Sequence, residues 1–156
     1  MSSKNKTETG AENVAWDLSD LYKSPEDPKL LEDKKDLLEQ ADKFANKYHG
    51  RISALSASEF SNALRAYESL IQRAGKIGSY SHLIWSTNTE NAKLGKLLQE
   101  ANELGSELSQ KLVFCDVEWM KVDDDRAEEL INSKELFPWK HYLRVSRMYK
   151  DHTLSE

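Results

Sequence analysis

The stretch LGKLLQEANELGSELSQKLVFCDVEWM, residues 94–120, places an apolar residue at every third or fourth position. This spacing matches the 3.6-residue turn of an α-helix and gathers the apolar side chains on one side of it. We therefore predict a long helix that begins near Thr87 or Thr89 and ends at about Lys121. The apolar series comprises Leu94, Leu97, Ala101, Leu104, Leu108, Leu112, Cys115 and Trp119.

The end of this stretch, LVFCDVEWM (residues 112–120), is apolar on more than one side. Val113, Phe114, Val117 and Met120 fall outside the main series, and only Asp116 and Glu118 are charged. A helix that is apolar on most sides is buried on most sides. We therefore expect this segment to pack against a further surface.

Two other long helices have clear start signals. Asp27 is a favoured N-cap residue, and Pro28 after it is the residue favoured at the first helical position. This helix should run to Tyr48, with Gly50 as its stop signal. Ser56 and Glu59 have the spacing of a capping box, which predicts a second helix continuing to Thr87.

Gly75 and Gly78 lie inside this second predicted helix. Glycine costs about 1 kcal/mol in a helix interior relative to alanine. Two glycines among small neighbours suggest that another backbone approaches closely. The alternative is a kink or break in the helix between them.

The C-terminal third predicts two more helices. The three acidic residues Asp123 to Asp125 favour a helix N-terminus, and this short helix should extend through Ile131. A calcium loop fits poorly, because residues 123–134 lack the mid-loop glycine and the final glutamate of an EF-hand. A last helix should follow Pro138.

The N-terminus differs from the rest of the chain. Residues 1–15 are polar and predict a disordered tail. Residues 16–28, which include Trp16, Leu18 and Tyr22, predict an extended arm that docks on a neighbouring surface, although a flexible linker is the alternative. No strand pattern competes, so the predicted fold is all-α: an antiparallel bundle of about five helices, several of them long, with an extended N-terminal arm.

Composition limits the classes of function. The chain has 156 residues with 27 acidic and 22 basic side chains, so its net charge is −5 with the signs interspersed. This argues against a nucleic-acid partner, which needs clustered lysine and arginine. The sequence shows no secretory leader and no apolar run long enough to span a membrane, so we expect no membrane partner and a cytoplasmic location.

The sequence shows no catalytic or metal-binding residues. An H-E-x-x-H zinc site needs two histidines four residues apart, and His49, His82, His141 and His152 are far from one another. No histidine has a glutamate three residues before it, as a di-iron bundle requires. The one cysteine, Cys115, lies in the apolar series and is interpreted as a core residue.

Three segments resemble the oligoendopeptidase F (PepF) branch of the M3 family of zinc metallopeptidases. They are WDLSDLYKSPEDPKLLED (16–33), GKIGSYSHLIWSTNTEN (75–91) and KELFPWKHYLRVSRMYKDHTLSE (134–156). The resemblance covers residues 16–156 and implies the family's N-terminal helical domain. In that family an H-E-x-x-H helix in the C-terminal catalytic domain binds zinc. The resemblance therefore implies a peptidase of short peptides whose zinc is held outside this chain.

The resemblance also implies a role for this domain: it packs on the catalytic domain of the same polypeptide and forms one wall of the substrate channel. Because the final residues, KDHTLSE (150–156), look like a helix start, we expect the chain to be interrupted there. The alternative is a free-standing helical interaction module without catalysis. Substrate-contacting residues are not predicted. The residues expected to pack between domains are Trp16, Leu18, Tyr22, Val113, Phe114, Val117 and Met120.

Overall fold

The computed structural model describes residues 17–148 and 150, and within them it confirms the all-α prediction. The predicted tail (1–15), Trp16 and residues 151–156 lie outside the described residues. The described part contains five α-helices and two short 3₁₀ helices. In chain order these are α1 (Pro28–Tyr48), η1 (Ile52–Ala54), α2 (Ala57–Thr87), α3 (Ala92–Lys121), α4 (Asp124–Ile131), η2 (Phe137–Trp139) and α5 (Lys140–Arg147).

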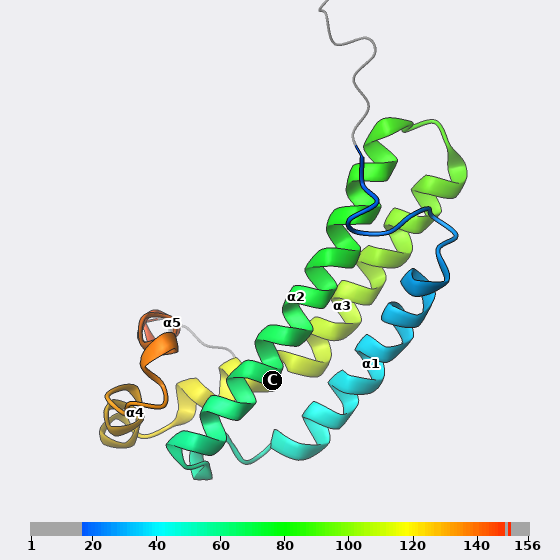
Figure 1. Ribbon diagram of the computed structural model, residues 1–156. Coiled ribbons are helices and arrows are strands. Elements are labelled where there is room, and N and C mark those ends of the chain that lie inside the picture. Colours follow the sequence, from blue (N-terminus) through cyan, green and yellow to red (C-terminus); the bar gives the residue numbers. More distant parts are fainter. Residues whose placement is uncertain (1–16, 149, 151–156) are drawn as a thin grey trace, which may run out of the picture.

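The three long helices form the main body, and α2 runs antiparallel to both α1 and α3 (Figure 1). Short connections, residues 49–56 and 88–91, join α1 to α2 and α2 to α3. The two short helices, α4 and α5, form a separate group beside the end of α3 (Figure 1). We call residues 122–150 the end lobe.

Side-chain caps fix where most helices begin. The Asp27 carboxylate accepts a hydrogen bond from the Lys29 amide, and the Asp123 carboxylate caps α4. Ser56 and Glu59 form the predicted capping box at the start of α2. The start of α3 was predicted too early: α2 continues through Thr87, and Asn91 caps α3 by accepting from the amides of residues 93 and 94.

The two glycines of α2 do not bring another backbone close, so that prediction is wrong. A methyl group added at Gly75 or Gly78 would meet no atom within 4 Å, and α2 runs unbroken through both positions. The reason is that α2 buries other residues of this segment instead. Ile77 and Tyr80 are each 1% exposed, whereas Gly75 lies on the exposed side.

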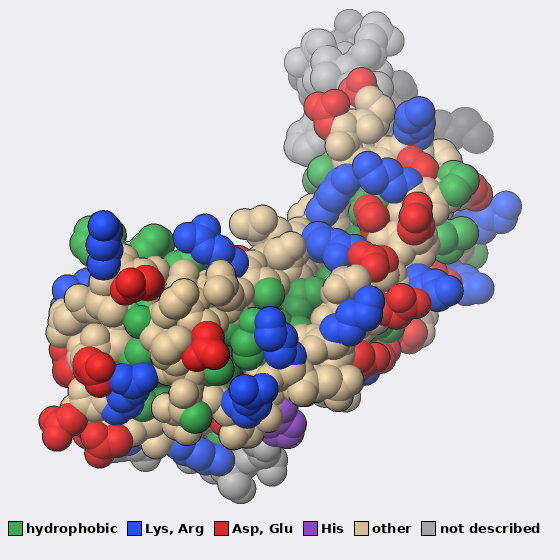
Figure 2. All heavy atoms as spheres, turned by 60° about the horizontal axis from the view of Figure 1, so that its bottom comes forward, with side chains coloured by type: hydrophobic (Ala, Val, Ile, Leu, Met, Phe, Trp, Pro, Cys, Tyr) green, Lys and Arg blue, Asp and Glu red, His purple; other side chains and the backbone are tan. Residues whose placement is uncertain are grey.

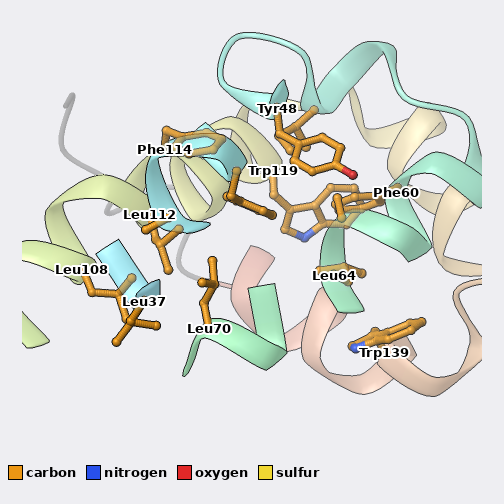
Figure 3. Packing of buried hydrophobic residues seen from close by; sticks show 14 of the residues in the cluster. Leu37, Tyr48, Phe60, Leu64, Leu70, Leu108, Leu112, Phe114, Trp119 and Trp139 are labelled. Atoms are coloured by element: carbon orange, nitrogen blue, oxygen red, sulfur yellow. The ribbon is translucent and has the colours of Figure 1, made fainter. Parts of the chain in front are cut away.

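The core lies between the three long helices and continues into the end lobe (Figure 3). Leu37, Leu108 and Leu112 are buried in the main body. Nearer the end lobe the core becomes aromatic, and the Trp119 and Phe60 ring centroids lie 5.2 Å apart. Full burial of one large apolar side chain contributes about 1.5–3 kcal/mol, so this continuous core ties the end lobe to the bundle.

Within residues 17–27, the N-terminal arm docks on helices of the chain itself. Tyr22 is 2% exposed, and its hydroxyl donates to an Asp33 carboxylate oxygen over 2.8 Å. Its ring meets Tyr80 edge-on at 5.1 Å, and the Lys76 ammonium lies 4.5 Å from the ring centre. The arm is therefore anchored to both α1 and α2.

Candidate functional site

Exposed apolar side chains gather on the end lobe. The described residues include seven exposed large hydrophobic side chains, and four of them come from η2, α5 and the residue after α5. Phe137 is 72% exposed and Met148 is 77% exposed, and Tyr142 and Val145 lie between them in sequence. We call these four residues the α5 face. Large apolar side chains that stay exposed in one short segment of a folded surface are candidates for an interaction site.

The opposite side of α5 is anchored in the core. Leu143 is fully buried, and its carbonyl oxygen accepts a hydrogen bond from the Trp119 indole over 3.0 Å. The Arg147 guanidinium donates to the carbonyl oxygens of Trp119 (2.7 Å) and Val122 (2.8 Å). These contacts hold α5 against the end of α3, so the α5 face has a fixed orientation.

A carboxylate of α4 completes this anchor. Arg147 and Lys150 both donate to Asp124, which lies in the first turn of α4. Hydrogen bonds from Lys150 and then Arg147 hold the pKa of Asp124 below its ordinary value. Because Asp124 is itself largely exposed, we expect these contacts to orient the two helices more than to stabilise the fold.

A groove runs beside α5. It encloses about 430 Å³ and is lined by residues of three helices: Tyr67 and Ile71 of α2, Asp116 and Met120 of α3, and Tyr142 and Ser146 of the α5 segment. The exposed side chain of Ile71 adds to the apolar surface next to the α5 face.

Two tyrosines contribute hydroxyl groups to this groove, beside the polar side chains of Asp116 and Ser146. The Tyr142 hydroxyl donates to an Asp116 carboxylate oxygen over 2.8 Å. Burial, followed by the charge of Asp116, raises the pKa of Tyr142, and the same two causes raise the pKa of Tyr67 to about 12. Both phenols therefore stay protonated and remain hydrogen-bond donors at neutral pH.

The residues predicted to pack between domains lie in different environments. Tyr22 is buried under the arm, and Phe114 and Val117 are buried within this chain. Phe114 is covered by residues of α1 and the turn after it, with its ring centroid 5.9 Å from Phe44 and 4.7 Å from His49. That these side chains contact another domain stays a prediction.

Three of the predicted packing residues retain accessible surface. Leu18 is partly buried against the core, Met120 is partly buried and lines the groove, and Val113 is 48% exposed. The sequence reasoning missed the α5 face altogether. The sequence did contain a signal for this surface. Residues 142–148 include more apolar side chains than one buried stripe of a helix needs, so some of them had to lie on a side other than that of Leu143.

Cys115 is partly buried among aromatic side chains that include Tyr67 and Trp119. Burial raises the pKa of its thiol well above the ordinary value, so the group stays protonated. The described residues contain no group of three or more histidine, cysteine or acidic side chains that could hold a metal ion. Nor does any helix among them have the length and apolar character to cross a membrane.

Comparisons with known proteins agree with one another. The family described as Oligopeptidase F matches residues 118–156, which include the end of α3 and the end lobe. Oligopeptidase PepF of Bacillus subtilis (strain 168) is 25% identical over 154 residues, which are 97% of this chain and 22% of that protein. The chain thus spans about a fifth of this relative, and no solved structure matches it. Both matches therefore show similarity to the oligopeptidase F branch of the M3 peptidases, over residues 118–156 for the family and over most of the chain for the relative.

Proposed function

We propose that this chain is the N-terminal helical domain of a longer oligopeptidase F-like zinc metallopeptidase that hydrolyses peptide bonds in short peptides. In this proposal the domain packs on the catalytic domain and forms one wall of the substrate channel. The observation that carries it is the position of the α5 face, which lies inside the segment that matches the Oligopeptidase F family.

The energetics of the α5 face support a packing role. Burying one large apolar side chain contributes about 1.5–3 kcal/mol, and Phe137 and Met148 are mostly exposed. Because Arg147 and Trp119 already hold α5 in place, little conformational entropy would be lost when a partner covers the face. A rigid apolar face is well suited to a permanent contact within one polypeptide.

The peptidase chemistry would reside outside this chain. In a zinc peptidase, the metal polarises the scissile carbonyl and activates water with a glutamate as general base. The contribution of this domain is confinement of the peptide and support for the catalytic domain. We expect the purified chain to contain no stoichiometric zinc and to cleave no short fluorogenic peptide. Chelator-sensitive cleavage that scales with the amount of purified chain would contradict this expectation.

The gene supplies the test of the whole proposal. The reading frame should continue past codon 156 to an H-E-x-x-H motif, and the full-length protein should show chelator-sensitive cleavage of a short peptide. The substitutions Phe137→Asp and Met148→Asp together should lower that activity, because they place charges in the packed interface. Leu31→Asp, on an exposed site of α1, is the matched control.

Two results would overturn the proposal. A stop codon directly after Glu156 in an intact gene would favour a free-standing interaction module. A full-length enzyme whose activity is unchanged by the two substitutions on the α5 face would show that this face does not pack on the catalytic domain.

A further inference from the structure

A furrow lies between α1 and α2, away from the α5 face. Its main part encloses about 330 Å³, and a second part of about 140 Å³ shares Lys47 and Tyr48 with the first. Side chains of both helices form the apolar part of its lining, and basic side chains form much of the rest. The apolar residues are Phe44, Tyr48, Leu55, Ala66 and Leu70.

Three cations line this furrow and interact with its carboxylates only at longer range, Lys43 with Asp36 and both Lys47 and Arg51 with Glu59. Lys43, Lys47 and Arg51 follow one another at intervals of four residues. None of them has a described carboxylate within ion-pair distance. Lys43 and Lys47 lie on α1, and like charges four residues apart on a helix destabilise it by about 0.2–0.5 kcal/mol, so this pair is unfavourable for folding alone.

The carboxylates inside the furrow are already engaged. Asp36 accepts hydrogen bonds from Arg73 (2.6 Å) and Gln40 (3.1 Å). Glu59 accepts from both the backbone amide and the hydroxyl of Ser56, at the start of α2. The furrow therefore has a local excess of positive charge in a chain whose net charge is −5.

Some lysines elsewhere on the three long helices do form ion pairs with carboxylates. Lys34 binds Glu100 of α3 over 3.0 Å, and Lys111 of α3 binds Asp42 of α1. Figure 2 shows one face of the molecule, on which apolar side chains lie among lysine, arginine and acidic side chains.

We propose that the furrow binds an extended acidic peptide segment that alternates carboxylates with apolar side chains. Residues four apart on a helix are separated by about 6 Å along its axis. Alternate side chains of an extended peptide are separated by about 6.6 Å and point the same way. Acidic side chains at alternate positions would therefore reach Lys43 and Lys47, while the intervening apolar side chains contact the furrow lining.

The test uses the described chain itself and needs no catalysis, so its outcome is separate from that of the proposed function. The probe is a fluorescein-labelled hexapeptide of alternating glutamate and leucine, and its counterpart has lysine in place of glutamate. Fluorescence anisotropy should show saturable binding of the acidic peptide alone, weakened by added salt because the contacts are exposed ion pairs.

Matched variants locate the binding site. Lys43→Gln with Lys47→Gln should weaken binding of the acidic peptide about fivefold, the expected loss for two partly exposed ion pairs. Lys35→Gln with Lys93→Gln removes the same total charge from exposed sites elsewhere and should leave the affinity unchanged. Circular dichroism confirms that each variant remains folded.

Three outcomes would overturn the proposal: equal affinity for the acidic and basic peptides, no saturation by the acidic peptide, or equal losses in the two pairs of variants. A single-stranded oligonucleotide of the same charge serves as competitor. Displacement of the peptide by this oligonucleotide at equal concentration would show that the furrow recognises negative charge alone. This result would also contradict the proposed peptide site.

Discussion

Arg147 joins three parts of the molecule through one side chain. Its guanidinium donates to the carbonyl oxygens of Trp119 and Val122, binds Asp124 and lies 5.3 Å from the centre of the Trp119 ring. The side chain is only 11% exposed, so these hydrogen bonds are shielded from water. The orientation of the α5 face therefore depends on Arg147 more than on the exposed ion pairs of the end lobe.

Replacement of Arg147 should destabilise the fold. Arg147→Met keeps the apolar stem but removes charged hydrogen bonds to two carbonyl groups, so we expect a loss of about 2 kcal/mol in the free energy of unfolding. Urea denaturation measures this loss. Arg144→Met is the control on the same helix: Arg144 is half exposed and lies 3.6 Å from Glu128, so its loss should be below about 0.5 kcal/mol. Equal losses would contradict the assigned role.

Cys115 should react slowly with thiol reagents in the folded protein. Burial raises the pKa of its thiol, and the thiolate is the reactive form. We expect the rate with a disulfide reagent at about pH 8 to be at least tenfold lower than in urea-unfolded chain. Comparable rates in the two states would show that Cys115 is accessible and activated.

At the scale of the element, start signals were the most informative part of the sequence. Asp27, Ser56 and Asp123 each cap a helix where the sequence predicted one. The start of α3 was missed because Thr87 and Thr89 are also residues of the capping type. Thr87 instead donates its hydroxyl to the Ile84 carbonyl at the end of α2, and Asn91 becomes the cap.

Removal of the capping box should destabilise α2 in a pH-dependent way. Ser56→Ala should cost about 1 kcal/mol at neutral pH. The hydrogen bonds from Ser56 lower the pKa of Glu59 in the folded state, so their contribution is present above the unfolded pKa and lost as the pH falls through the folded one. The stability gap between wild type and variant should narrow between about pH 6 and pH 3. A gap independent of pH would contradict the role of Glu59.

Replacement of the α2 glycines should stabilise the protein. Gly75→Ala and Gly78→Ala meet no atom within 4 Å and remove a residue that disfavours helix. Each should add about 0.5–1 kcal/mol to the free energy of unfolding. Thermal denaturation measures the gain. A loss of stability at either site would contradict the open space that surrounds these two glycines.

At the scale of the whole molecule, the sequence predicted the core better than the surface. The apolar spacing of α3 identified its buried side, because residues that are buried along one side of a helix recur every three or four positions. The same reasoning assigned Phe114 and Val117 to a partner, although α1 and the turn after it cover Phe114. Which extra apolar residues stay exposed depends on how helices far apart in sequence pack, and spacing alone does not contain that information.

The isolated chain should self-associate through the α5 face. Light scattering should show species larger than a monomer as the concentration rises, together with binding of a hydrophobic dye, because Phe137 and Met148 are exposed. The Phe137→Asp and Met148→Asp double variant should shift the chain toward monomer and lower dye binding. A monomeric wild-type chain that binds no dye would contradict this expectation.

The central claim is that the α5 face packs on the remainder of a longer peptidase. Hydrogen–deuterium exchange of residues 137–148 tests it most directly, when the isolated chain is compared with the full-length protein from the same gene. We predict slower exchange of this segment in the full-length protein than in the isolated chain. The middle of α1 should exchange at the same rate in the two proteins. Equal exchange of residues 137–148 in the two proteins would contradict it.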